Sequence, residues 1–129
     1  MSLSSEESPI LVVEDDANIL RQIEFNLRSH GYFVVTATSG IEALRLLLLQ
    51  KPCLLITDIM MPEMDGYELV ATLRKERTLA DLPVIMLTAR AGERDMLEGY
   101  TSGTDLYLTK PFNPAELVSF VERILHVDE

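Results

Sequence analysis

The sequence predicts an α/β domain in which a parallel five-stranded sheet is covered by helices on both faces. Five short runs of β-prone apolar residues occur along the 129-residue chain. Stretches with apolar residues at helical spacing alternate with these runs, and capping or turn residues separate the two kinds of segment. Strands and helices that alternate in this way form a parallel sheet with right-handed crossovers.

The composition describes one soluble globular domain, with 47% hydrophobic and 25% charged residues. A formal net charge of −10 argues against nucleic-acid binding, which needs a basic face. It suits a carboxylate site for a cation, although a solvated acidic surface explains most of the charges. Cys53 is the only cysteine, and no apolar run has the length of a membrane span. These features favour a cytoplasmic location.

Residues 1–8 are polar and lack the features of a signal peptide, so we expect a disordered lead followed by a domain over residues 9–127. The first strand is predicted at residues 10–13 and the first helix at residues 17–30, with a second strand at residues 32–36. Between the first strand and the first helix stand three consecutive acids, Glu14, Asp15 and Asp16.

The second helix opens with an expected capping box of Ser39 and Glu42 and extends through Gln50. It carries four consecutive leucines at residues 46–49, which cannot all face the core of one helix. We therefore expect at least one of them to be exposed. Such a leucine is either a scattered apolar residue or part of a contact surface.

The third strand, at residues 53–57, is a continuous apolar run, which is typical of a strand buried on both faces. It leads directly to Asp58, and a capping box of Asp65 and Glu68 opens the third helix. Ligands of open α/β sheets bind just outside the carboxyl ends of the strands. Asp58 is therefore the first functional candidate.

The remaining elements follow the same order. A fourth strand at residues 84–87 ends at Thr88, and a short helix is expected at residues 93–100. A fifth strand at residues 105–109 leads to Lys110. The last helix is expected to begin with a capping box of Asn113 and Glu116, with proline in its first position.

Polar residues at the strand ends therefore meet at one edge of the sheet: Glu14, Asp15, Asp16, Asp58, Thr88 and Lys110. Clustered carboxylates repel one another unless a cation neutralises them, and a set of oxygen ligands suits Mg²⁺. An aspartate can be a phosphoryl acceptor, a lysine can pair with a phosphoryl oxygen, and a threonine can donate a hydrogen bond to one. The combination favours phosphoryl transfer.

The sequence resembles the response-regulator receiver domains of two-component signalling over residues 9–127. The matching segments are EDD after the first strand, TDIMMPEMDG after the third, MLTA after the fourth and YLTKPF after the fifth. The resemblance implies a single (βα)5 doubly wound, flavodoxin-like domain with strand order 2-1-3-4-5. The site is expected at the switch between the first and third strands.

The resemblance also implies the site residues. Asp58 is the expected phosphoacceptor, and Asp15 and Asp16 are expected to hold Mg²⁺ together with Asp58 and the backbone carbonyl of Met60. Lys110 and Thr88 are expected to bind the phosphoryl group.

Three further features follow from the same resemblance. Tyr107 matches the aromatic residue that turns inward when Thr88 moves toward the phosphate. The Lys110–Pro111 peptide bond is expected to be cis. Gly66 is expected to allow a close turn under the site.

The implied function is a signalling domain, not an enzyme, which promotes only its own phosphotransfer and dephosphorylation. A sensor histidine kinase or phosphotransfer protein is the expected donor. A downstream output domain or protein is expected to read the face formed by the fourth helix, the fifth strand and the last helix. We expect no direct nucleic-acid or membrane binding, and the resemblance allows a phosphorylation-dependent dimer.

Two departures from the family pattern concern Leu106, which replaces the second acid of GADDYL, and Arg90, at a variable position that tunes phosphoryl lifetime. Structural alternatives exist for the site residues: a capping or loop aspartate for the acids, a surface lysine for Lys110 and a half-buried strand aromatic for Tyr107.

Two other functions compete with the phosphoacceptor. One is a pseudo-receiver that binds partners without phosphorylation. The other is a hydrolase or a nucleotide- or flavin-binding enzyme on the same fold. The absence of glycine at residues 14–18 argues against the latter, because that turn offers no loop to cradle a phosphate.

Overall fold

The structure is a computed structural model that describes residues 8–88 and 104–126. Its strands are β1 (Ile10–Val13), β2 (Val34–Ala37), β3 (Leu54–Asp58), β4 (Val84–Thr88) and β5 (Leu106–Thr109). Its helices are α1 (Ala17–Ser29), α2 (Gly40–Leu49), α3 (Gly66–Arg74), the short 3₁₀ helix η1 (Arg77–Leu79) and α5 (Pro114–Leu125). All strand pairs are parallel, in the order β2-β1-β3-β4-β5, which confirms the predicted topology.

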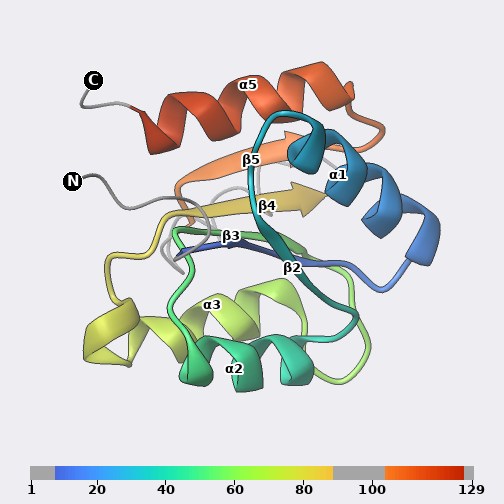
Figure 1. The fold of residues 1–129 in the computed structure, drawn as a ribbon. Coiled ribbons are helices and arrows are strands. Elements are labelled where there is room, and N and C mark those ends of the chain that lie inside the picture. Colours follow the sequence, from blue (N-terminus) through green and yellow to red (C-terminus); the bar gives the residue numbers. More distant parts are fainter. Residues whose placement is uncertain (1–7, 89–103, 127–129) are drawn as a thin grey trace.

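The sheet separates two apolar cores, because successive strand residues point to opposite faces. Helices α1 and α5 cover one face and α2 and α3 cover the other (Figure 1). In β1, Ile10 and Val12 pack toward α1 and α5, whereas Leu11 and Val13 pack toward α2 and α3. All five residues of β3 are buried, as the continuous apolar run predicted for a central strand.

The helix caps differ in part from the expected boxes. Asp65 and Glu68 form the complete capping box at the start of α3. At α2, the Ser39 hydroxyl accepts from the Glu42 N–H, but the Glu42 carboxylate accepts from the Thr38 N–H at 2.8 Å. That carboxylate therefore reaches one residue further back than a box requires.

At α5 the Asn113 side chain accepts from the backbone N–H of Ala115, while the N–H of Glu116 donates to the Asn113 carbonyl. The N-cap prediction is confirmed there. The Asn113 side chain, however, accepts from the N–H of Ala115 and not from that of Glu116. The hydrogen bonds among the described residues therefore do not form the expected capping box.

The second strand begins later than the sequence predicted. The Gly31 and Tyr32 N–H groups still donate to the Arg28 and Leu27 carbonyls of α1, and Gly31 has a φ of +89°. This C-terminal capping arrangement includes Tyr32, the first residue of the expected strand. The Phe33 carbonyl accepts from the Ile10 N–H, and the paired register with β1 starts at Val34.

Several expectations lie outside the described residues: seven of the eight residues of the N-terminal lead, Arg90 and the helix expected at residues 93–100. Within the described part of the chain, no helix is both long and apolar enough to cross a membrane.

Candidate functional site

The strand register brings the predicted site residues to one edge of the sheet. Val13 is paired with Thr57, so that Glu14 and Asp58 follow side by side at the ends of β1 and β3. Thr88 ends β4 and is paired with Thr109, which places Lys110 next along β5. Glu14 and Asp58, which are 44 positions apart in the sequence, thus become neighbours at the carboxyl ends of the strands.

A buried ionic network occupies the centre of this edge. The Lys110 ammonium lies 2.7 Å from Glu14 Oε1 and 3.2 Å from Asp58 Oδ2. Both carboxylates are buried, and the lysine side chain is mostly covered. The arrangement holds the ammonium between the two acids.

The charge of Lys110 is stabilised by these contacts. Burial disfavours its charged form, but the hydrogen bond and charge of Glu14 and the charge of Asp58 outweigh that effect. The pKa of Lys110 is therefore raised above its ordinary value. This lysine remains a cation at neutral pH even though little of it contacts solvent.

Three acids gather around the same point. Glu14, Asp15 and Asp58 each offer a carboxylate oxygen, and these oxygens lie within 4.8 Å of one another. We call them the acidic group. The pKa of Asp15 is raised by partial desolvation and by the hydrogen bond and negative charge of Glu14, against the opposing charge of Lys110.

Asp16 lies outside the acidic group, whereas the resemblance implies it as a metal ligand. Its Oδ1 accepts hydrogen bonds from the N–H groups of Asn18, at 2.9 Å, and Ile19, at 3.3 Å. These bonds make Asp16 the N-cap of α1, a role that turns its carboxylate toward the helix. The structure brings Glu14 into the group instead.

A sequence signal for this exchange was available. Asp16 directly precedes the first helical residue, where capping acids are preferred. Assigning the cap to Asp16 leaves Glu14 and Asp15 as the pair that can face Asp58.

The acidic group fits a hard divalent cation. Its donors are all carboxylate oxygens, which Mg²⁺ prefers. Three carboxylates opposed by the single ammonium of Lys110 leave a charge of about −2 when all are ionised. Met60 lies two residues past Asp58 in the loop to α3, with its side chain exposed.

The two switch candidates lie beside the group. Thr88 is buried at the end of β4, and its carbonyl accepts from the Lys110 N–H at 2.6 Å. Tyr107 is half-buried in β5 and packs against the core on the α2 and α3 side.

The loop after β3 makes a close turn at Gly66. The Gly66 N–H donates to the Ile59 carbonyl at 2.9 Å. A β-carbon on Gly66 would lie 2.5 Å from the Asp58 carbonyl oxygen and 2.8 Å from Met86 Sδ, so only glycine fits. The close turn expected under the site is confirmed, and the Lys110–Pro111 bond is cis as expected.

The departure at Leu106 changes packing away from the acidic group. Leu106 is half-buried against the α1 and α5 core. The first acid of that segment, Asp105, accepts from the Val84 N–H at 2.8 Å and so ties the start of β5 to β4.

Comparison with known proteins gives consistent matches. The family model described as "Response regulator receiver domain" matches residues 10–122. A relative called "Probable transcriptional regulator ycf27", from Cyanophora paradoxa, is 44% identical over 120 residues, or 93% of this chain and 49% of the relative. The chain spans about half the length of the curated relatives it matches.

Solved structures match over nearly their full length. Chemotaxis protein CheY4 of Vibrio cholerae aligns with a TM-score of 0.88 and 33% identity, covering 92% of this chain and 98% of that chain. The receiver domain of sensor histidine kinase PA1611 from Pseudomonas aeruginosa PAO1 has a TM-score of 0.85 and 34% identity, with the same coverage. That neighbour was solved with a magnesium ion coordinated in its active site cleft.

Proposed function

The chain belongs to the response regulator receiver domain family, and from this premise we propose that Asp58 accepts a phosphoryl group from a histidine kinase in a Mg²⁺-dependent reaction. One observation carries the proposal. A buried aspartate at the end of the central strand stands 3.2 Å from the ammonium of the mostly covered Lys110, within a group of three acids.

The residues divide the chemistry between them. The Asp58 carboxylate is the nucleophile that attacks the phosphorus of the kinase's phosphohistidine. The N–P bond breaks, the imidazole leaves, and Asp58 becomes an aspartyl-phosphate. Lys110 transfers its ion pair from Asp58 to a phosphoryl oxygen, because phosphorylation removes the carboxylate charge that it now faces. Glu14, at 2.7 Å, keeps the ammonium in place during this exchange. The Thr88 hydroxyl donates to a second phosphoryl oxygen.

We propose Glu14, Asp15 and Asp58, with the Met60 carbonyl, as the residues that hold the metal. The support is the proximity of the three carboxylates and the use of Asp16 as a helix cap. When bound, Mg²⁺ would supply positive charge to the oxygens of the transferring phosphoryl group. This set replaces Asp16, expected from the resemblance, with Glu14.

We propose further that phosphorylation biases a two-state equilibrium. Movement of Thr88 toward the phosphate frees space that the half-buried Tyr107 then enters from β5. The surface formed by β5 and α5 changes shape for an output domain or protein. The same surface could serve a phosphorylation-dependent dimer.

The proposal is tested by the intact mass of the protein after incubation with acetyl phosphate. With Mg²⁺ we expect a gain of one phosphoryl group, about 80 Da. The gain should vanish in EDTA and in Asp58→Asn, which keeps the size of the side chain. Phosphoryl uptake by Asp58→Asn would place the acceptor elsewhere. Mg²⁺ binding without uptake in the wild type would favour a pseudo-receiver that binds partners without phosphate.

A further inference from the structure

Helix α2 has apolar residues on both its inner and its outer face. Gly40, Ala43 and Leu47 are buried against the sheet. On the opposite side, Ile41, Leu48 and Leu49 are 44%, 65% and 77% exposed. A surface helix normally carries polar residues on the side away from the core. The described part of the chain therefore leaves this second apolar face uncovered.

The outer face of α2 consists of Ile41, Arg45, Leu48 and Leu49, at positions i, i+4, i+7 and i+8, which lie on one side of a helix. Arg45 is exposed at its middle and makes no hydrogen bond or ion pair with residues 8–88 or 104–126. Glu42 lies one turn before Arg45 and is also exposed. A cation and an anion thus border the same apolar stripe.

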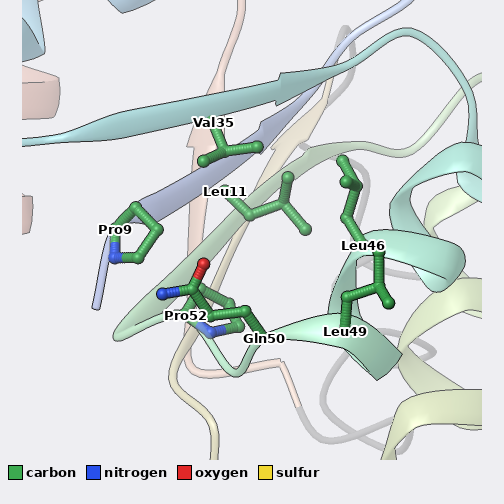
Figure 2. A pocket seen from close by; sticks show the side chains of 7 residues that line it. All are labelled: Pro9, Leu11, Val35, Leu46, Leu49, Gln50 and Pro52. Atoms are coloured by element: carbon green, nitrogen blue, oxygen red, sulfur yellow. The ribbon is translucent and has the colours of Figure 1, made fainter. Parts of the chain in front are cut away.

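The apolar surface continues into a hollow of about 250 Å³ at the C-terminal end of α2. Figure 2 shows the residues that line it: Pro9, Leu11, Val35, Leu46, Leu49, Gln50 and Pro52. Leu49 belongs both to the outer face and to the hollow. A projecting leucine pair therefore stands directly beside an apolar recess.

We propose that the outer face of α2 binds the same face of a second copy of this chain, in an antiparallel pair around a two-fold axis. A two-fold interface uses one patch on both copies, so the patch must be self-complementary. This patch meets that condition, because exposed apolar residues stand at both of its ends and a cation and an acid lie between them. Antiparallel pairing brings Glu42 of each copy near Arg45 of the other and packs Leu48 toward Ile41.

Charge favours this register over a general association of the two copies. Each chain carries a net charge of −10, which repels a second copy at long range. Arg45 places a positive charge at the centre of the contact, where it opposes that repulsion. The association should therefore be weak at low salt and strengthen when salt screens the net charge.

Sedimentation equilibrium of the 129-residue chain, without phosphodonor, tests the proposal. Over about 10 µM to 1 mM we expect the mass to rise from monomer toward dimer, at lower concentration in higher salt. Leu48→Ser with Leu49→Ser should remain monomeric. Phe25→Ser is the matched control, because Phe25 is 71% exposed on α1, away from α2, and its variant should dimerise like the wild type.

Substitutions of Arg45 provide a second test, which does not change the apolar surface of the contact. Arg45→Glu should lower the association constant by about tenfold, whereas Arg45→Lys should keep it near the wild-type value. A wild type that stays monomeric throughout would overturn the proposal and leave the face to a different macromolecule. A dimer that survives the double leucine substitution would overturn it too, by placing the contact elsewhere.

Discussion

Asp15 and Asp16 are adjacent in the sequence but have different roles in the structure. Asp15 belongs to the acidic group, whereas Asp16 caps α1 through the N–H groups of Asn18 and Ile19. Sequence reasoning placed both near the site because both follow the first strand. It could not choose between them, because the direction of the Asp16 side chain depends on the backbone conformation of that residue, which is extended at the start of α1.

This division predicts opposite effects for two neighbouring substitutions. Asp15→Asn should greatly weaken Mg²⁺ binding and leave the helix intact, because it removes a ligand charge. Asp16→Ala should lower the free energy of unfolding by about 1 kcal/mol and leave Mg²⁺ affinity nearly unchanged. Isothermal titration with Mg²⁺ and urea unfolding of both variants measure the two effects. Equal losses of Mg²⁺ affinity would contradict the assignment of Asp16 to the cap.

Glu63 has a backbone conformation that the sequence did not reveal. Its φ is +69°, a region where side chains with a β-carbon are disfavoured. Glu63→Gly should therefore raise the free energy of unfolding by about 1 kcal/mol, as measured by urea denaturation. Glu63→Ala is the control, because alanine keeps the β-carbon and should give no comparable gain. Equal stability of the glycine and alanine variants would show that Glu63 carries no such strain.

At the scale of elements, the turn between β3 and α3 connects packing directly to the site. Gly66 approaches the Asp58 carbonyl so closely that a β-carbon would displace the end of β3. Gly66→Ala should cost about 3 kcal/mol of unfolding free energy and slow phosphoryl uptake, because Asp58 moves with that backbone.

Gly31 provides the comparison for this prediction. It has a positive φ but open space where a β-carbon would stand. Gly31→Ala should cost about 1 kcal/mol and leave phosphoryl uptake unchanged. Urea unfolding and the acetyl phosphate reaction check both variants. Normal uptake by a folded Gly66→Ala protein would contradict the proposed link between the turn and Asp58.

The sequence predicted the elements well where a single physical rule decides them. The buried β3 and the capped start of α3 follow from an apolar run and from the Asp65–Glu68 pair. The start of β2 and the partner of the Glu42 carboxylate were wrong. The Tyr32 N–H is already bonded to the end of α1, and the Glu42 carboxylate accepts from the N–H of Thr38 and not from that of Ser39. Residue type alone does not decide between such alternative hydrogen bonds.

At the scale of the whole molecule, the alternation of strands and helices predicted the sheet order and the site at its edge. It did not predict that Glu14 reaches Lys110, 96 positions away, because that contact depends on the register of the three strand pairs that connect β1 to β5. The sequence thus predicted where the candidate site lies and which kinds of residue form it. Which of these residues contact one another could be read only from the structure.

Binding of Mg²⁺ to the folded state should stabilise the whole domain. The acidic group is assembled from β1 and β3, so the unfolded chain lacks it. Above the dissociation constant, each tenfold rise in Mg²⁺ should add about 1.4 kcal/mol to the free energy of unfolding. Urea titrations at constant ionic strength measure the effect, and Asp15→Asn should lose it. Equal stabilisation of that variant would locate the bound ion outside the acidic group.

The measurement that tests the central claim most directly is chemical location of the acceptor. After reaction with acetyl phosphate and Mg²⁺, borohydride reduces an aspartyl-phosphate to homoserine, which peptide mass spectrometry can place in the sequence. We expect homoserine at position 58 and unchanged aspartate at positions 15 and 16. Homoserine at another position, or none in protein that has gained a phosphoryl group, would contradict the assignment of Asp58 as phosphoacceptor.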